Sequence, residues 1–383
     1  MSKVCIITSA HLVLDPRIFF KQARSLVKAG YKVTLIAQND KNEVINGIEI
    51  IGLGNPKTRF HRMFCLTNQM LKKALTINAD AYHIHDPELL PVLVIIKLLT
   101  KKFTVFDIHE NIKESIKIKE YLNSISRIIF AFAYTLIESF FLKFVDVIIL
   151  AEDSYKKNYT NIRNKYIIRN YPLIKHEINS IKINAINHNS ELFIISVVGQ
   201  IAKERGAFEI LSAVKILIDR GLDNIRLNFI GFFETTSLRR ELEDYIVKYE
   251  LHNNIKFTNQ IPHPMVAKIL EESNLGLAIL HPKPNYLESM PTKIFEYYLA
   301  GIPVIASNFQ AWERIVVDTD CGLIVDPLNP KSIAEAINYL FDNPSKAEEM
   351  GKNGQKLIEK TYNWDNERIK LLTLYKDLLS LKR

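Results

Sequence analysis

The chain alternates short apolar segments with longer amphipathic ones along almost its whole length. The apolar segments are rich in Val, Ile, Leu and Ala, and the stretches between them repeat apolar residues three or four positions apart. The expected strands cover residues 4–9, 31–37, 48–51, 81–84, 103–107 and 145–150, then 192–198, 226–230, 255–257, 275–280 and 303–307. Helices are expected between them, for example over 19–29, ended by Gly30, and over 62–77. This alternation predicts α/β units with parallel, doubly wound sheets.

The alternation starts afresh after residue 190, which indicates a second domain. With 383 residues, the chain is long enough for two cores. We expect one domain over residues 1–173, a linker rich in Asn, Ile and Lys over 174–190, a second domain over 191–363, and a last amphipathic helix over 364–383. Ligands of such sheets lie at the carboxyl ends of the strands, so the residues that follow each strand matter most.

Positive charge is concentrated in the first half of the chain. Residues 1–173 contain 25 Lys and Arg against 15 Asp and Glu, a net charge of +10, whereas the remainder carries −2. The imbalance suggests an anionic partner for the first half. Because no nucleic-acid-binding motif is present, a membrane surface or a lipid diphosphate fits better than nucleic acid. The three cysteines are far apart and form no C-x-x-C pair, as in a cytosolic protein with reduced thiols and no zinc cluster.

The most hydrophobic region spans residues 128–150. It contains Glu138, Lys143 and Asp146, so a helix followed by a strand is expected rather than a membrane span. The wider segment 111–144 mixes lysines with Ile, Phe and Tyr. It fits either an amphipathic surface that contacts anionic lipid or a core-facing helix with a solvated basic side.

Residues 284–307 hold the pattern with the most chemical content. Glu288 and Glu296 are separated by seven residues, and Pro291 lies between them at a position where a helix can begin. Ser289 or Thr292 is expected to cap that helix. A glycine at 301 would end it before a short buried strand.

The start of this helix suits a diphosphate. A helix N-terminus presents free N–H groups and a partial positive charge, and Lys293 adds a cation in the first turn. Glu288 could accept hydrogen bonds from sugar hydroxyls on one side of the phosphates, and Glu296 from a ribose on the other. This combination predicts a nucleotide-sugar site. The alternative is an ordinary amphipathic helix with two solvated glutamates.

The same stretch resembles a known family. Its E-x7-E spacing, followed by x-Y-x-A-G-x-P-V-I, is similar to the retaining glycosyltransferases of family 4, which have the GT-B fold. The longer form L-H-P-x-P-N-Y-L-E-S-x-P-T-K-x-F-E-Y resembles a subgroup acting in bacterial capsule, O-antigen and exopolysaccharide assembly. The resemblance implies two Rossmann-like domains facing a cleft and a final helix that returns to the first domain.

The resemblance also implies an activity. It implies transfer of a sugar from a nucleotide-sugar, UDP favoured over GDP, to a saccharide on a polyprenyl diphosphate, with retention of configuration. It implies neither cofactor nor metal, and a cytoplasmic enzyme at the inner face of the plasma membrane. The sequence Asp318-Thr319-Asp320 has the D-x-D form of metal sites in glycosyltransferases of another fold, but here it only precedes an apolar strand.

A second motif follows the strand at 192–198. The segment from Gly199 to Gly206 resembles the family's G-R-x-x-x-x-K-G loop, whose two cations hold the donor diphosphate. Gln200 replaces the usual Arg and Arg205 the usual Lys, so the resemblance implies phosphate contacts from Arg205 and from Lys203 as a substitute. Gly199 allows close approach of the backbone. The donor-binding set is therefore Gly199, Lys203, Arg205, Glu288, Pro291, Thr292, Lys293 and Glu296.

Three residues of the first half are further candidates. The resemblance places His109, after the strand at 103–107, near the donor sugar or the acceptor, so the catalytic candidates are His109, Glu288 and Arg205. Arg17, in a D-P-R-I turn like the family's first loop, would contact an anionic ligand, or else pair with a surface carboxylate. His85 ends its strand facing the ligand side, and Asp86 is expected to cap the next helix.

Two rival functions remain open. An epimerase-like enzyme of the same fold would use the nucleotide-sugar without a glycosyl acceptor. An inactive scaffold would keep the fold and lose activity. The replacement of the usual Arg by Gln200 is the feature that favours this alternative.

Overall fold

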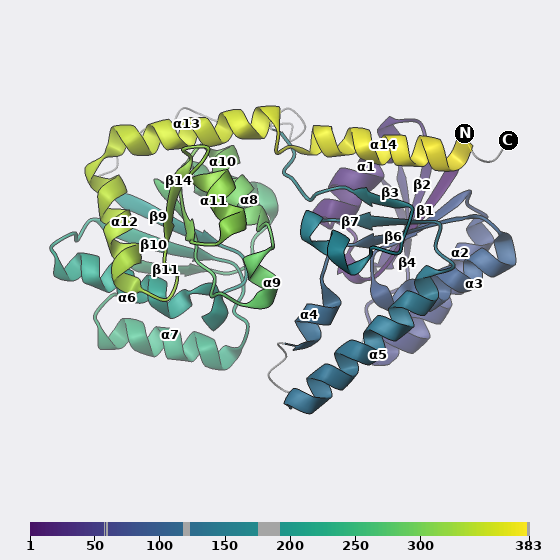
Figure 1. The fold of residues 1–383 in the computed structure, drawn as a ribbon, viewed down its shortest axis with the longest axis horizontal. Helices are drawn as coiled ribbons and strands as arrows, with labels where there is room; N and C mark the ends of the chain where they lie inside the picture. The colour runs from purple at the N-terminus through teal and green to yellow at the C-terminus, as the bar shows by residue number, and fades with distance from the viewer. Residues whose placement is uncertain (57, 59, 118–122, 175–191, 381–383) are drawn as a thin grey trace. The chain divides into compact units, whose positions relative to one another are not determined.

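The computed structural model describes residues 1–56, 58, 60–117, 123–174 and 192–380 (Figure 1). Its contacts divide the chain into two compact units. The first unit comprises Met1–Asn170 and the final segment from Trp364, and the second comprises Tyr171–Asn363. The predicted linker, except for its first residue, lies outside the described residues. The last helix is part of the first unit.

The first unit is built on a sheet with the strand order β3-β4-β2-β1-β5-β6-β7-β8 among the described residues. All neighbouring pairs are parallel except β3–β4. The strands are β1 (Lys3–Leu12), β2 (Lys32–Gln38), β3 (Glu43–Ile45), β4 (Ile48–Gly52), β5 (Ala81–Ile84), β6 (Phe103–Ile108), β7 (Val147–Leu150) and β8 (Lys165–Ile167). The six strands expected for this half are confirmed, and β3 and β8 were not predicted.

Helices connect these strands and cover the sheet (Figure 1). They are η1 (Pro16–Ala23), α1 (Arg24–Lys28), η2 (His61–Leu66), α2 (Thr67–Ile77), η3 (Pro87–Leu89), α3 (Leu90–Thr100), α4 (Ile112–Lys117), α5 (Ser124–Leu142), η4 (Asp153–Asn158) and α14 (Trp364–Ser380). The helix expected over 19–29 begins earlier, as a π-helix, because the Asp15 carboxylate accepts hydrogen bonds from the N–H groups of Arg17 and Ile18. Gly30 then ends the helical segment in the left-handed conformation.

The helix α14 completes the first unit from the other end of the sequence. The indole N–H of Trp364 donates to the hydroxyl of Ser25 at 2.9 Å. Further along, the Tyr375 hydroxyl lies 2.9 Å from Nδ1 of His83 on β5. The backbone N–H of Arg169 donates to the Glu367 carboxylate. All three of Trp364, Glu367 and Tyr375 are buried, so α14 is part of this core rather than an appendage.

The second unit is a parallel sheet with the order β11-β10-β9-β12-β13-β14 over its described residues. The strands are β9 (Phe193–Val198), β10 (Ile225–Ile230), β11 (Ile255–Thr258), β12 (Leu275–Ala278), β13 (Val304–Ser307) and β14 (Gly322–Val325). The helices are η6 (Lys203–Arg205), α6 (Ala207–Asp219), α7 (Thr236–Lys248), α8 (His263–Glu271), α9 (Pro284–Leu287), α10 (Thr292–Ala300), α11 (Gln310–Val316), α12 (Pro330–Asp342) and α13 (Pro344–Lys360).

Both faces of this second sheet are buried, as the continuous apolar strands predicted. Along β13, Ile305 belongs to the core that α6, α7 and α12 cover, whereas Val304 and Ala306 belong to the core beneath α10 and α11. Side chains of a strand point alternately to its two faces, so one short strand contributes to both cores.

The helix α10 is fixed to the sheet by one tyrosine. The Tyr297 hydroxyl donates to the carbonyl of Leu277 on β12 and accepts from the N–H of Val198 on β9. The ring fits because β12 has a glycine beneath it: a Cβ on Gly276 would lie 2.3 Å from the Tyr297 ring. This contact sets the start of α10 beside the ends of β9 and β12.

Candidate functional site

Two glycines bring the loops after β9 and β10 into backbone contact. Gly199 has φ +106° and Gly231 φ +153°, and a Cβ on Gly231 would lie 2.0 Å from the Gly199 carbonyl oxygen. Any side chain there would push the two loops apart. The position of a Cβ on Gly199 would be 3.8 Å from Nη1 of Arg205. The glycine therefore leaves space beside the guanidinium at the carboxyl end of the strand.

Arg205 and Lys293 form the cationic part of this region. The Arg205 guanidinium lies over the Tyr286 ring, 5.9 Å from its centroid, and its Nε is buried without a hydrogen-bond partner among the described residues. Burial lowers the pKa of Lys293 to about 7; the positive charge of Arg205 adds to the effect and Glu296 opposes it. Burial and the neighbouring cation disfavour the charged form of Lys293, and an incoming anion would favour that form.

The N-terminus of α10 adds to this cationic region. The helix begins where it was predicted, but Pro291 takes the capping position instead of the first helical position, and Thr292 is the first helical residue; Gly301 ends the helix with φ +78°, as predicted. The expected side-chain cap is wrong: no side chain caps α10, and the Ser289 hydroxyl donates instead to the Tyr286 carbonyl. The Ser289 side chain points toward α9 because this residue belongs to the turn that follows that helix. The residue at the capping position of α10 therefore offers no side-chain acceptor to the first-turn N–H groups.

The two glutamates lie on either side of this helix start. Glu288 is exposed on the turn after α9, and Glu296 is half-buried a little over one turn into α10. Lys203 differs from the expectation. Its ammonium lies 2.6 Å from the Glu241 carboxylate on α7. The side chain that was predicted to hold a phosphate therefore forms a surface ion pair instead. Such an exposed pair is weak and exchanges readily.

The D-x-D sequence is part of the scaffold. The Asp320 carboxylate accepts a hydrogen bond from the Lys346 ammonium at 2.7 Å, and its backbone is in the left-handed conformation of a turn. It thus links the end of α11 to α13.

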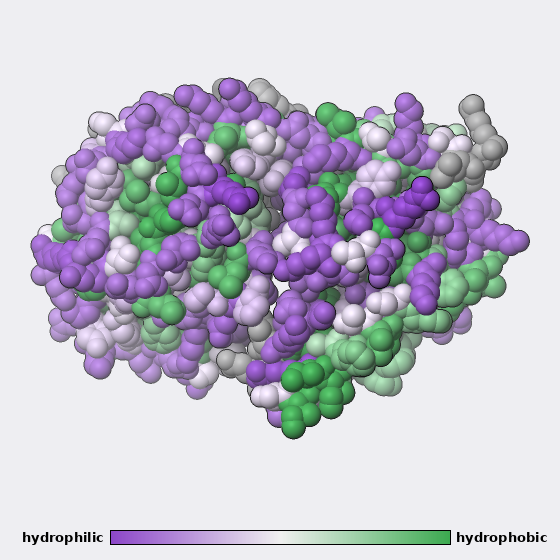
Figure 2. Space-filling view, viewed as in Figure 1, coloured by the Kyte–Doolittle hydropathy of each residue, from purple (hydrophilic) through white to green (hydrophobic). Residues whose placement is uncertain are grey.

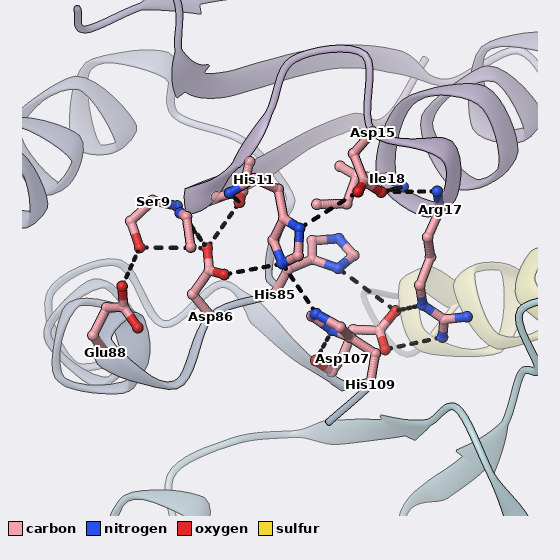
Figure 3. A network of polar contacts seen from close by, with 12 residues as sticks. Ser9, His11, Asp15, Arg17, Ile18, His85, Asp86, Glu88, Asp107 and His109 are labelled. Carbon is pink, nitrogen blue, oxygen red and sulfur yellow. Dashed lines mark hydrogen bonds and ion pairs between the residues drawn. The ribbon is translucent and has the colours of Figure 1, made fainter. Parts of the chain in front are cut away.

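The first unit has a polar pocket of its own at the carboxyl ends of β1, β5 and β6. Its volume is about 210 Å³. Three histidines line it, His11, His85 and His109, together with the acidic Asp86 and Glu88 (Figure 3). The sequence prediction named His85 and His109 but missed His11, which lies in the loop just after the first strand.

His11 is the charged member of this group. Its Nδ1 lies 3.4 Å from the Asp15 carboxylate and its Nε2 3.3 Å from that of Asp86. Burial opposes the charge, but the hydrogen bonds to Asp15 and Asp86 outweigh it and raise the pKa of His11 to about 10. His109 Nε2 lies 3.1 Å from Nε2 of His11. A protonated His11 has only donors, so His109 must accept with Nε2 and carry its own proton on Nδ1, which points to the Asp107 carbonyl (Figure 3).

Asp86 does not cap the helix after β5. Its carboxylate turns the other way and accepts from the Thr8 hydroxyl at 2.8 Å and from the Ser9 N–H at 2.6 Å. The following helical turn has no side-chain cap from this residue. Asp86 and Pro87 hold the predicted N-cap and first helical positions, but the expected side-chain cap is wrong, because the end of β1 offers several donors and the cation of His11 lies on the same side.

Arg17 is buried instead of facing a ligand. Its Nε and Nη2 each donate to the Asp107 carboxylate at 2.9 Å, and Nη2 also donates to the Ile168 carbonyl. Burial disfavours the charge of Asp107, but Arg17 outweighs this effect and lowers the pKa of that carboxyl. Arg17 therefore ties η1 to β6 and β8. The expected contact with an anionic ligand is not what this arrangement supports, and the alternative of a surface carboxylate is also wrong because the pair is buried.

His83 and His85 point to one face of β5, as their spacing predicted. Their rings stack with centroids 4.6 Å apart, and burial lowers the pKa of His83 to about 4 and that of His85 well below its usual value. Together with Asp107, their ligand atoms lie within 4.8 Å of one another, close enough for a metal ion. Both oxygens of Asp107 already accept from Arg17, whose positive charge opposes a cation at this position. Two neutral histidines beside a buried ion pair describe this group better than a metal site.

Residues 179–357 match the family model described as glycosyl transferases group 1. This part of the chain therefore resembles a glycosyltransferase group 1 domain, in agreement with the family resemblance seen in the sequence, whereas the polysaccharide-assembly subgroup stays a prediction. Over 176 residues it is 28% identical to the capsular polysaccharide biosynthesis glycosyltransferase CapM of Staphylococcus aureus, covering 45% of this chain and 42% of that protein. Over 192 residues it is 25% identical to spore coat protein SA of Bacillus subtilis, covering 48% of each. The matches span somewhat under half of these relatives.

Solved structures resemble the whole chain. A sucrose-phosphate synthase from Thermosynechococcus elongatus has a TM-score of 0.75 at 17% identity and covers both chains completely. The Anabaena protein HepE in complex with UDP-glucose has a TM-score of 0.72 at 13% identity, covering 98% of this chain and all of that one. At such identities the likeness concerns the fold, which is GT-B with two Rossmann-like units. The predicted fold class is confirmed.

Proposed function

We propose that this protein is a retaining glycosyltransferase that moves a sugar from a nucleotide-sugar to a lipid-linked saccharide during assembly of a bacterial surface polysaccharide. The observation that carries the proposal is the grouping of Arg205, Lys293 and the uncapped start of α10 within a group 1 glycosyltransferase domain. A leaving diphosphate develops negative charge, and preorganised cations and dipoles are the usual means of stabilising it.

The remaining roles follow from position. Glu288 would hold sugar hydroxyls and Glu296 the ribose, as carboxylates on either side of the diphosphate. A UDP-sugar is favoured because a UDP-sugar complex is known for a structural neighbour. Since two side chains and a helix start supply the positive charge, we propose that neither a metal nor a cofactor takes part.

For the acceptor we propose the polar pocket of the first unit. His109 would contact the sugar or the acceptor hydroxyl there, because it lines this pocket directly after β6. The capsular relative and the +10 charge of residues 1–173 support a polyprenyl-diphosphate acceptor and peripheral contact with an anionic membrane. These imply a cytoplasmic enzyme at the inner face of the plasma membrane.

The donor half is tested by thermal unfolding of purified protein with UDP, GDP, ADP and their sugars, with and without EDTA. A ligand at 100 times its Kd stabilises by about 2.7 kcal/mol, an easily measured shift. We expect a shift with UDP and its sugars that EDTA leaves unchanged, that Glu296→Ala abolishes and that Glu335→Ala, an exposed carboxylate of α12, preserves. No shift with any nucleotide would refute the proposal and favour an inactive scaffold.

The acceptor half is tested with radiolabelled nucleotide-sugars and bacterial membranes. We expect label in the organic-solvent extract only when membranes are present. Consumption of the nucleotide-sugar at the same rate without membranes would instead identify an epimerase-like enzyme.

A further inference from the structure

The helix α5 exposes an unusually large apolar surface. Its side chains with exposed fractions between 51% and 72% are Ile125, Ile128, Ile129, Phe130, Phe132, Leu136, Ile137 and Phe140. Figure 2 shows this apolar surface along the helix. Soluble monomers rarely expose contiguous apolar patches of more than a few hundred Å². Over the described residues, α5 is also the one helix long and apolar enough to cross a membrane by length and composition.

The exposed residues form a stripe along one side of α5. Positions 125, 129, 132, 136 and 140 recur at helical spacing and therefore share a face. The opposite side packs on the unit through Ala131, Glu138 and Leu142. The carboxylate of Glu138, the only acidic group of this helix, accepts hydrogen bonds from the hydroxyls of Tyr134 and Tyr159. The apolar stripe therefore carries no acidic side chain.

The packing of α5 favours an in-plane over a membrane-spanning orientation. The helix packs against α3 and α4, and β7 enters the central sheet a few residues after the helix ends. Spanning would place one end of this helix, and the sheet attached to it, across about 30 Å of hydrocarbon. Lying in the interface plane buries only the stripe and leaves these contacts intact.

Charge distinguishes a lipid surface from a second copy of the chain. The stripe ends at the exposed Lys143, and α4, which packs on α5, brings Lys113 and Lys117. Residues 1–173 carry a net charge of +10. A symmetric dimer through α5 would bring two such units together and be opposed by their repulsion, whereas anionic headgroups attract them.

We propose that α5 is an in-plane membrane anchor, whose apolar stripe inserts at the boundary between headgroups and acyl chains while the neighbouring lysines contact anionic lipid. The proposal rests on the membrane contact included in the proposed function and assigns it to one surface and one mode of binding. Apolar insertion supplies most of the affinity, and charge supplies attraction to the right membrane. The stripe thereby holds the first unit at the surface from which a lipid-linked acceptor projects.

The test is co-sedimentation of the full chain with phosphatidylcholine vesicles that contain about one third phosphatidylglycerol. The α5 variant is Phe132→Ser with Leu136→Ser, and the control variant replaces equally exposed apolar residues elsewhere, Val247→Ser with Ile369→Ser. We expect the α5 variant to lose vesicle affinity by at least about tenfold per side chain, because burying each large apolar side chain is worth at least a factor of ten. The control should bind like the wild type.

Two further measurements, vesicle binding at high salt and the thermal shift with UDP, distinguish this proposal from purely electrostatic binding and from the donor proposal. Raising salt from about 0.05 M to about 0.5 M screens charge but not apolar burial, so wild-type binding should weaken and persist. Both variants should retain the thermal shift with UDP, so a failed donor proposal is recognised independently. Loss of all binding at high salt, or unchanged binding of the α5 variant, would overturn the proposal.

A fluorescence experiment reports the depth of insertion. Both natural tryptophans are buried, so Phe132→Trp introduces a reporter on the stripe. Acyl chains brominated near the headgroup should quench its emission. Absence of quenching would overturn the proposal, and so would a wild-type dimer in solution that the α5 variant dissolves, which would identify the stripe as an interface between copies.

Discussion

Replacing Lys293 with methionine should make the unliganded protein more stable and abolish nucleotide binding. The side chain is buried on α10, and its pKa falls from 10.5 to about 7, chiefly through burial and then through Arg205. Each pKa unit corresponds to about 1.36 kcal/mol, so the charged form costs up to roughly 5 kcal/mol in the folded state. Methionine has similar length and no charge, and removes that cost.

The pH dependence has a definite sign. Between about pH 7 and 10.5 the unfolded chain holds the Lys293 proton and the folded chain has lost it, so wild-type stability rises with pH in this window. Lys293→Met has no such proton. Its advantage over the wild type should be full below pH 7 and vanish near pH 10.5.

Thermal unfolding measures this difference. At pH 6, a gain of roughly 2–5 kcal/mol should raise the Tm by at least about 4 °C. Lys331→Met, which changes an exposed lysine of the same unit, is the control and should alter neither the Tm nor the UDP shift. A lower Tm for Lys293→Met at pH 6, or an unchanged UDP shift, would refute the reasoning. The expected combination is a stability–function trade-off at a ligand site.

Three other changes test the scaffold. Arg17→Ala should destabilise the first unit by about 3–5 kcal/mol, seen as a lower Tm, because the buried Asp107 carboxylate loses its counter-charge and, among the described residues, keeps only the hydrogen bond from Gln22. An effect below about 1 kcal/mol would mean that the pair is solvated. Gly276→Ala should cost about 1–3 kcal/mol in urea unfolding by displacing the Tyr297 ring, and wild-type stability would contradict that packing. The pKa of His11 is raised from 6.5 to about 10, so its stabilising effect is complete below pH 6.5 and lost as pH rises through 10. His11→Gln should accordingly lower the Tm at pH 6 and have little effect near pH 10; an equal loss at both pH values would argue against a charged His11.

Local sequence signals predicted the strands and the start of α10 well. Continuous apolar runs mark buried parallel strands, and Pro291 with Gly301 brackets a helix whichever side chains surround it. The short strand β3 was missed although the signal was present. Asn46 and Gly47 both have positive φ between the antiparallel β3 and β4, as an Asn-Gly hairpin turn requires.

The polar partners were harder to predict, because long-range contacts decide them. Asp86 and Lys203 each have a plausible local role, and each instead bonds to a group that the fold brings near, whereas Ser289 bonds to the carbonyl of Tyr286 in its own turn. Arg17 and Asp107 are 90 residues apart in sequence, and no local sequence pattern predicts their pairing. The charge of His11 depends on Asp15, four residues later, and on Asp86, which the fold brings to the same place. The short spacing to Asp15 was the one local signal of this role.

The placement of α14 also has a consequence for biosynthesis. The first unit is assembled from both ends of the sequence, and the second unit is inserted between them. On the ribosome, residues 171–363 emerge and can complete their own core while Ser25 and His83 still lack their partners on α14. The unit made first is therefore finished last. A nascent chain stalled before Trp364 would present an open hydrophobic surface on its oldest part, where a chaperone would have to bind.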